Sequence, residues 1–176
     1  EAIICCFREK GVPVYVVGGA VRDSLMGLSP HDYDLTTPAT PDEILAIMAG
    51  KKTFREGKKF GTIAVMTELG PVEITTFRID GTYTDNRKPD VVTFTADLKE
   101  DLARRDFTVN AMAYSHETGL VDPFGGREDL QNKILRAVGD PARRFSEDAL
   151  RILRAFRFMG QLNMTLDPAL LAATKT

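Results

Sequence analysis

The sequence contains only two cysteines, Cys5 and Cys6, which are adjacent and have no further thiol to pair with. A disulfide framework is therefore excluded, which favours a reducing, cytoplasmic location. Histidine is equally scarce, and His31 and His116 stand far apart in the chain, which argues against a histidine-based metal centre or catalytic triad. No apolar run approaches the ~20 residues of a membrane-spanning helix, so we expect no membrane association.

Excess positive charge is also missing. The formal net charge is −2, so the chain lacks the global basic signature of a nucleic-acid-binding protein, and any such binding must come from a local patch or from further segments. The 176 residues are 43% hydrophobic, which suffices for a sizeable core. The chain begins with Glu1, shows no signal peptide, and stops on LLAATKT without a helix-ending signal, so we interpret it as a fragment of a longer protein.

Strand and helix patterns alternate over residues 1–138, whereas residues 139–176 show only helical patterns. We therefore predict an α+β domain over 1–138 and the truncated start of an all-α domain over 139–176. Thr40, Pro41 and Glu43 mark one helix start with a capping box. The expected elements are helices at 1–11, 20–27, 40–50, 95–115 and 127–133, and strands at 13–18, 31–37, 53–57, 61–68, 71–79, 119–126 and 134–141, with helix only after that.

Two glycines, Gly18 and Gly19, join the first predicted strand to the next helix. They could form a plain tight turn. Alternatively, small residues here let backbone N–H groups approach a phosphate, and Arg22 in the first helical turn could add a guanidinium to the same phosphate. The spacing matches neither the dinucleotide fingerprint nor a P-loop.

Two carboxylates, Asp32 and Asp34, occupy alternate positions of the second predicted strand and should share a face. Like charges so placed repel each other, so either the strand is a solvated edge or a cation resolves the repulsion. Mg²⁺ prefers carboxylates together with substrate phosphate oxygens. Glu73 is the only acidic residue inside a predicted apolar strand, so it is our candidate third carboxylate, unless it simply faces solvent.

Two further segments concentrate charge on predicted helices. ARRDF contains Arg104, Arg105 and Asp106 and is followed by Asn110. The second segment is EDALRILRAFRF, which we predict to be one helix capped by Ser146, with an apolar stripe and a polar arc. Taken alone, both segments could be solvated surfaces with intrahelical ion pairs. The polar arc carries Glu147, Asp148, Arg151, Arg154 and Arg157.

Four ordered stretches nevertheless resemble the motifs of one family over roughly residues 14–160. They are GGAVRDSLMG…HDYDL, DLARRDFTVNAMAY, DPFGGREDLQNKILRAVGDP and RRFSEDALRILRAFRF. The sequence resembles the tRNA nucleotidyltransferase and bacterial poly(A) polymerase family, eubacterial and eukaryotic class, within the polymerase-β-like superfamily. The resemblance implies a palm-type head, with a mixed sheet flanked by helices, followed by an all-α neck.

The resemblance also implies residue roles. The first motif would contact the triphosphate through Gly18, Gly19 and Arg22, and would bind Mg²⁺ through Asp32 and Asp34. The second motif would hold the nucleotide and its ribose through Arg104, Arg105, Asp106 and Asn110. In the fourth motif, Asp148 and Arg151 would read the base edge, with Arg154 and Arg157 in support. The polar loop 83–90, with Asp85 and Arg87, would govern the switch from C to A, although a solvated hairpin loop remains the alternative.

The implied activity is template-independent addition of C and A from CTP and ATP to tRNA 3′ ends, with release of pyrophosphate. Cytosine and adenine both present an exocyclic amine that a carboxylate can accept from, whereas uracil and guanine do not present the same pattern. Addition of CC only, of A only, or of poly(A) are alternatives within the family. A non-catalytic nucleotide- or RNA-binding module is a further alternative, against which the paired aspartates argue.

Overall fold

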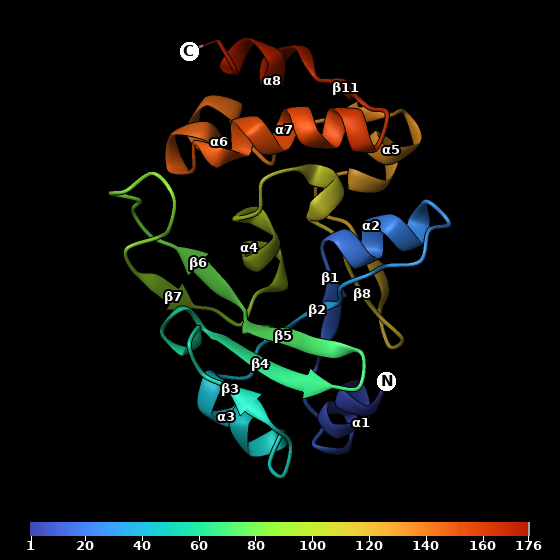
Figure 1. The fold of residues 1–176 in the computed structure, drawn as a ribbon, viewed down its shortest axis with the longest axis vertical. Helices are drawn as coiled ribbons and strands as arrows, with labels where there is room; N and C mark the ends of the chain where they lie inside the picture. The colour runs from blue at the N-terminus through green and yellow to red at the C-terminus, as the bar shows by residue number, and fades with distance from the viewer. Residues whose placement is uncertain (176) are drawn as a thin grey trace.

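The computed structural model describes residues 1–175 as a mixed β-sheet with helices on its faces and a helical stack at the C-terminal end (Figure 1). Within these residues, no helix is both long and apolar enough to cross a bilayer. In chain order the elements are α1 Ala2–Glu9, β1 Tyr15–Val17, α2 Gly19–Leu25, β2 Asp34–Thr37, α3 Pro41–Ile47, β3 Thr53–Phe54, η1 Lys58–Phe60, β4 Thr62–Thr67, β5 Gly70–Thr76, β6 Arg78–Asp80, β7 Val92–Phe94, α4 Leu98–Ala103, η2 Thr108–Asn110, β8 Ala113–Ser115, β9 Gly119–Val121, α5 Gly126–Gln131, β10 Ile134–Leu135, α6 Pro141–Glu147, α7 Leu150–Gln161, β11 Thr165–Leu166 and α8 Pro168–Ala173.

The main sheet has the strand order β3-β4-β5-β2-β1-β8-β9. Its neighbouring strands are antiparallel except for β2 and β5, which run parallel, so the expected mixed sheet is confirmed. Asp34 lies opposite Glu73 on β5 and opposite Val17 on β1. Since directly opposite residues face the same side of a sheet, the two carboxylates share one face.

The other face of the sheet is covered by α1 and α3 (Figure 1). Phe7 and Ile44, from these helices, are fully buried in one cluster with Ile74 of β5. The start of α3 is as predicted: the Thr40 hydroxyl accepts from the Glu43 N–H, and the Glu43 carboxylate accepts from the Thr40 N–H. The face bearing Asp34 is partly covered as well, because Val17, the partner of Asp34, is buried in a smaller cluster with Leu102 and Ala113, so the carboxylates lie beside this second cluster.

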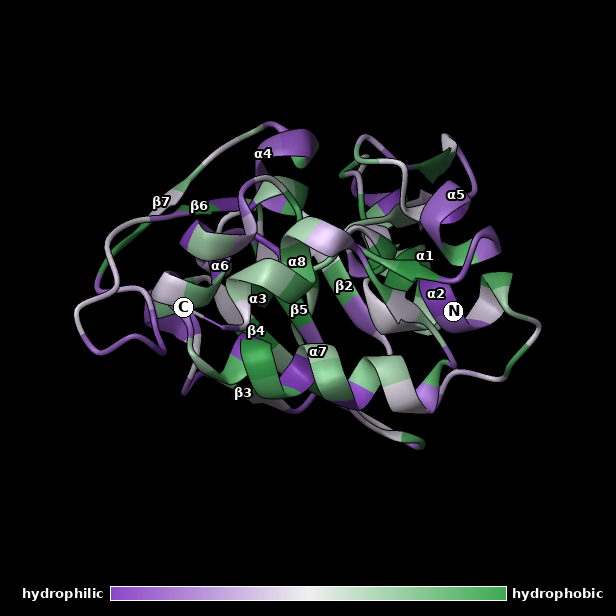
Figure 2. Cartoon of the chain, turned by 90° about the horizontal axis from the view of Figure 1, so that it is seen from above, coloured by the Kyte–Doolittle hydropathy of each residue, from purple (hydrophilic) through white to green (hydrophobic). Residues whose placement is uncertain are grey.

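Helices α6, α7 and α8 stack at the far end of the molecule (Figure 1), and α7 carries both hydrophobic and hydrophilic residues (Figure 2). Their core includes Phe107 and Leu135 from before residue 138 and Phe158 and Leu170 from after it. Strand β10 also pairs in parallel with β11. The domain boundary at 138/139 stays a prediction, but packing is continuous across it.

The helix predicted over residues 95–115 is wrong in its second half. Asp97 caps α4, which ends at Ala103, and the chain then forms the short η2 helix and strand β8. Strand β8 pairs Ala113 with Val17 of β1, and Phe107 is buried in the C-terminal core. These long-range partners override the helical pattern of the local sequence.

The single helix predicted for EDALRILRAFRF, with Ser146 as its cap, is also wrong at its start. Asp148 is extended, with φ −146° and ψ 104°, and separates α6 from α7. Ser146 is not a cap; it lies inside α6 and donates to the Arg143 carbonyl. The helical face inferred for Glu147, Asp148 and Arg151 therefore does not exist as one face. The predicted apolar stripe is on α7 but stays largely exposed, at 46% for Leu150, 67% for Leu153, 43% for Phe156 and 37% for Met159.

Candidate active site

The glycine turn between β1 and α2 has the backbone geometry that requires glycine. Gly18 has φ 74° and ψ −134° and precedes the first residue of α2. A Cβ added there would lie 3.7 Å from Nη1 of Arg105, an ordinary contact, so its backbone conformation rather than space demands glycine. Gly18 directly follows Val17, the cross-strand partner of Asp34, so the turn lies next to the carboxylates.

Arg22 connects the first motif to the second. Its Nη1 donates to Oδ1 of Asn110 at 2.7 Å, and its Nε donates to Oδ1 of Asp23 at 2.9 Å. Its guanidinium also lies 5.1 Å from the ring centroid of Phe158 on α7. Residues from three separate stretches of the chain therefore fix the position of one arginine.

Asp106 joins the second motif to the fourth. Its buried carboxylate accepts from the Phe107 N–H at 2.7 Å and from Nδ2 of Asn110 at 3.2 Å. Its Oδ2 accepts from Nε of Arg154 at 2.8 Å, and the Arg154 guanidinium lies 5.3 Å from the Phe158 ring centroid. Phe158 thus contacts two guanidinium groups, and the structure brings together Arg22, Asp106, Asn110 and Arg154.

The acidic residues lie at the edge of this cluster. Asp34 is the first residue of β2, with its side chain exposed, and Glu73 lies opposite it on β5. Asp32 precedes the strand instead of belonging to it, which corrects the predicted strand over 31–37. Burial raises the pKa of Asp34, and Asp32 adds to the rise while Arg105 opposes it. Burial and the charge of Asp34 likewise raise the pKa of Glu73.

Burial is the main cause of both raised pKa values, and a neighbouring carboxylate adds to each, from Asp32 at Asp34 and from Asp34 at Glu73. Carboxylates gathered in this way are the donors that suit a hard cation. Asp32 and Asp34 are the residues that would hold it. Within residues 1–175, no group of three or more His, Cys, Asp or Glu side chains is already arranged to hold a metal ion. Glu73 is therefore adjacent to the pair but not preassembled with it.

Arg105 lies between the glycine turn and the interior. Its Nη2 donates to Oδ2 of Asp101 at 3.4 Å, and it is close enough to Asp34 to oppose the rise in that residue's pKa. Its neighbour Arg104 turns away and donates through Nε to Oδ1 of Asp101 at 3.1 Å. Of the two adjacent arginines, Arg105 is the one that faces the site.

The predicted site residues of the fourth motif lie in different surroundings. Arg151 is buried and donates to Oε2 of Glu147 at 2.8 Å and to the Arg104 carbonyl at 3.2 Å. The Oδ1 of Asp148 accepts from the Leu150 N–H at 2.9 Å. Arg157 is exposed and donates to Gln161, so the structure does not bring it to the cluster.

The polar loop 83–90 reaches the joint between α6 and α7. Asp85 accepts from the backbone N–H groups of Arg87 and Lys88 at 3.0 and 2.9 Å, which lowers its pKa. The Asn86 carbonyl accepts from the Ala149 N–H at 3.1 Å, next to Asp148. The loop is thus in contact with the predicted base-reading segment.

Two residues of this region escaped the sequence-based prediction. Phe158 contacts both Arg22 and Arg154, and Asp101 binds both Arg104 and Arg105. Helical spacing offered a signal for each, because Phe158 lies four residues after Arg154 and Asp101 lies four before Arg105.

A mixed sheet with a glycine turn, strand-end carboxylates and converging arginines defines a nucleotidyltransferase head of the polymerase-β-like class. Residues 14–136 match the poly A polymerase head domain family. The chain belongs to that family, whose nucleotidyltransferases generally use divalent metal ions.

The named relatives of this chain are CCA-adding enzymes. The CCA-adding enzyme of Levilactobacillus brevis is 47% identical over 171 residues, which is 97% of this chain and 43% of that protein. The Bacillus stearothermophilus CCA-adding enzyme in complex with CTP is 43% identical, with a TM-score of 0.86, over 98% of this chain and 41% of that one. The Thermotoga maritima CCA-adding enzyme complexed with tRNA_CCA is 29% identical, with a TM-score of 0.80, over 99% and 40%. This chain spans about two fifths of the length of these relatives.

Proposed function

We propose that the protein containing this chain adds C and A nucleotides from CTP and ATP to tRNA 3′ ends, without a nucleic-acid template and with release of pyrophosphate. The observation that supports this most is that Arg22 and Arg154 both lie against Phe158 and are linked to each other through Asn110 and Asp106. This cluster lies beside the strand that carries Asp34. The choice of reaction rests on the relatives, which are named CCA-adding enzymes.

The triphosphate is held at the glycine turn. Gly18 and Gly19 let the backbone approach the phosphates, and Arg22 and Arg105 supply positive charge there. Asn110 and Asp106 hold the ribose while they also hold the two arginines of the cluster. Since these contacts do not involve the base, they serve CTP and ATP equally.

Asp32 and Asp34 hold Mg²⁺, and Glu73 is the adjacent third carboxylate. When bound, Mg²⁺ neutralises charge on the reacting phosphates. The protein's own contribution is to present carboxylates whose mutual repulsion is relieved by a cation, and to orient the α-phosphate toward the terminal ribose hydroxyl through Arg22 and Arg105.

Asp148 and Arg151 remain our proposal for the base-reading pair, although Asp148 lies in the break between α6 and α7 and Arg151 lies inside α7. The Oδ1 of Asp148 is held by the Leu150 N–H, and its Oδ2 has no hydrogen bond within the described residues. The Arg151 guanidinium is fixed by Glu147 and the Arg104 carbonyl. A fixed guanidinium three residues after an unpaired acceptor oxygen offers the donor and acceptor that the edge of cytosine or adenine requires. Arg154 supports the pocket in this proposal, whereas Arg157 lies outside the cluster and is given no role in it.

The alternatives are addition of CC only, of A only, or of poly(A) by the same chemistry, and the loop 83–90, with Asp85 and Arg87, bears on this choice. A non-catalytic binding module would have little use for neighbouring carboxylates such as Asp32, Asp34 and Glu73. We further propose a cytoplasmic location, because tRNA maturation and unpaired thiols both suit a reducing compartment.

The test is incorporation of each labelled nucleoside triphosphate by the full-length protein on tRNAs that end before C, after C, after CC and after CCA. We expect C on the first two, A on the third and nothing on the last, with no U or G. Addition of C without A, of A alone, or of long A tails selects an alternative within the family. Metal-independent nucleotide binding without incorporation would leave only the binding module.

A further inference from the structure

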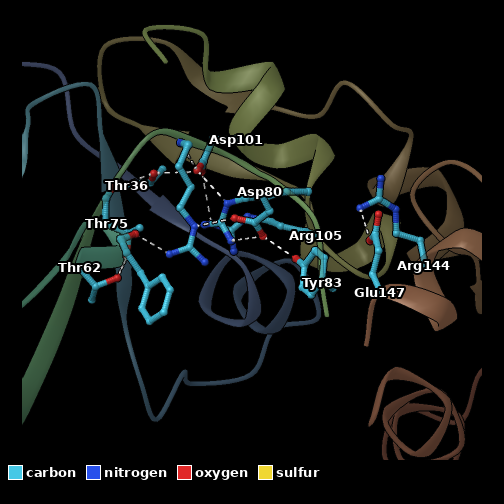
Figure 3. A network of polar contacts seen from close by, with 12 residues as sticks. Thr36, Thr62, Thr75, Asp80, Tyr83, Asp101, Arg105, Arg144 and Glu147 are labelled. Atoms are coloured by element: carbon cyan, nitrogen blue, oxygen red, sulfur yellow. Dashed lines mark hydrogen bonds and ion pairs between the residues drawn. The ribbon is translucent and has the colours of Figure 1, made fainter. Parts of the chain in front are cut away.

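A buried carboxylate on α4, Asp101, binds groups from three elements (Figure 3). Asp101 is 0% exposed. Its Oδ2 accepts from Oγ1 of Thr36 on β2 at 3.0 Å and from Nη2 of Arg105 at 3.4 Å. Its Oδ1 accepts from the backbone N–H of Arg78 on β6 and from Nε of Arg104, both at 3.1 Å. One side chain therefore connects the metal-binding strand, the β6 hairpin and both arginines of the second motif.

The negative charge of Asp101 is balanced by the groups that surround it. Burial disfavours its ionised form, but the positive charges of Arg104 and Arg105 and the Arg78 N–H outweigh burial and keep the pKa of Asp101 below its ordinary value. Asp101 is therefore a carboxylate at neutral pH. A buried charge of this kind is tolerated only with its full set of partners.

Arg105 depends on Asp101 more than Arg104 does. Among the described residues, Asp101 is the single hydrogen-bond partner of the Arg105 side chain, and the buried Nε of Arg105 has none. On its other side, Arg105 faces Gly18 and Asp34. Arg104 has a second carboxylate, Asp80, at 4.0 Å. Removing the Asp101 charge therefore releases the arginine that faces the glycine turn.

We propose that Asp101 is a positioning residue for nucleotide binding: it holds the Arg105 guanidinium against the glycine turn and, through Thr36, keeps it in register with Asp34 two residues earlier. This inference rests on the proposed function, in which Arg105 binds the triphosphate. Asp101 itself touches no substrate. Its effect must therefore pass through Arg105, and it must be the same for every nucleotide.

The primary variant is Asp101→Asn, which keeps the shape of the side chain and removes its charge. In the full-length protein we expect the equilibrium Kd and the KM for CTP and ATP to rise together by about tenfold, the loss expected for one charge-assisted hydrogen bond. The kcat should change by less than about threefold, and the preference between CTP and ATP should not change, because the base-reading residues are untouched.

Asp129→Asn is the matched control. Asp129 is 6% exposed and accepts from Oγ1 of Thr108 at 2.7 Å and from Nε of Arg136 at 3.2 Å, so it resembles Asp101 in burial and partner types. Both variants should lower the midpoint of urea unfolding. The control should leave the Kd for CTP within about twofold of wild type, since none of its partners is an arginine of the site.

A double variant tests whether Asp101 acts on nucleotide binding through Arg105. If Asp101 acts through Arg105, then adding Asp101→Asn to Arg105→Gln should change the Kd little further. Additive effects, an unchanged Kd in folded Asp101→Asn, or an equal rise in Asp129→Asn would each overturn the inference. If Asp101→Asn does not fold, Thr36→Val replaces it, with a smaller rise expected, equal for CTP and ATP; an unchanged Kd there would also overturn the inference.

Binding and transfer are measured separately so that two failures can be told apart. Wild-type protein that binds CTP but transfers no nucleotide contradicts the proposed function, while the Kd values still judge Asp101. Wild-type transfer together with an unchanged Kd in Asp101→Asn contradicts only the positioning role. Absence of CTP binding by the wild type contradicts both.

Discussion

Replacing Glu73 by glutamine should stabilise the protein and impair nucleotide transfer at the same time. Glu73 lies opposite Asp34 in the parallel β2–β5 pair. Burial, followed by the charge of Asp34, raises the pKa of Glu73 above its ordinary value. The folded protein therefore holds this proton to a higher pH than the unfolded chain does, so stability falls as the pH rises and Glu73 ionises.

The expected gain in the free energy of unfolding follows from the repulsion between the Asp34 and Glu73 carboxylates. Two unit charges about 5 Å apart repel by about 0.8 kcal/mol in water and by about 3 kcal/mol at an effective dielectric constant of 20. Each residue keeps exposed surface although its carboxyl group is partly desolvated, so the water value dominates, and we expect Glu73→Gln to raise the free energy of unfolding by about 1 kcal/mol. That corresponds to a rise of about 2–4 °C in Tm for a domain of this size.

The assay is urea unfolding of the metal-free full-length protein between pH 4 and pH 7.5, beside CTP incorporation with Mg²⁺. The gain should be present at pH 7.5 and shrink toward pH 4, where wild-type Glu73 is protonated. Glu68→Gln, at an exposed position of the adjoining β4–β5 turn, should change neither property. A neutral or destabilising Glu73→Gln at pH 7.5, or a gain that does not depend on pH, would refute the repulsion between these carboxylates.

Three further changes are informative. Arg22→Ala should raise the KM for CTP and ATP alike by about tenfold or more, because it removes a guanidinium from the triphosphate and not from the base; a loss confined to one nucleotide contradicts that role. Asp148→Ala should raise UTP incorporation relative to CTP, whereas Arg157→Ala should change this kcat/KM ratio little; equal slowing of CTP and UTP in Asp148→Ala would make the residue structural. Phe158→Ala should cost about 3–5 kcal/mol in urea unfolding, since its ring packs in the core and contacts two guanidinium groups; a cost below about 1 kcal/mol would deny that packing.

Local signals predicted the parts of the fold that depend on neighbouring residues. The capping box at Thr40 and Glu43 and the proline between them set the start of α3 without outside help. The glycine turn at Gly18 was equally readable, because a positive φ is required there. Such features are decided within a few residues, so one sequence contains enough information.

The errors occurred where distant partners decide the backbone. Ala113 extends along β1 instead of continuing a helix, since Val17 needs a hydrogen-bonded neighbour in the sheet. Asp148 breaks the helix that periodicity favours, and its carboxylate accepts from the N–H of Leu150, the first residue of α7. Neither partner can be seen in a window of a few residues, and tertiary contacts outweigh propensity at both places.

The candidate site was partly predictable because its residues belong to recognisable motifs. The sequence did not indicate that Asp106 pairs with Arg154, or that Phe158 lies against Arg22, since these contacts join stretches about fifty or more residues apart. Asp101 was overlooked because a buried acid among arginines looks like surface charge when only the sequence is read.

The most direct test of the central claim is Mg²⁺-dependent addition of A to a tRNA ending in CC, compared between wild type and the variants Asp32→Ala and Asp34→Ala of the full-length protein. Circular dichroism and urea unfolding establish that each variant is folded. The two-aspartate site predicts that wild type adds one A only with a divalent metal ion, and that both folded variants lose transfer at every Mg²⁺ concentration. Near-wild-type turnover in either variant, or transfer by wild type without metal, would contradict it.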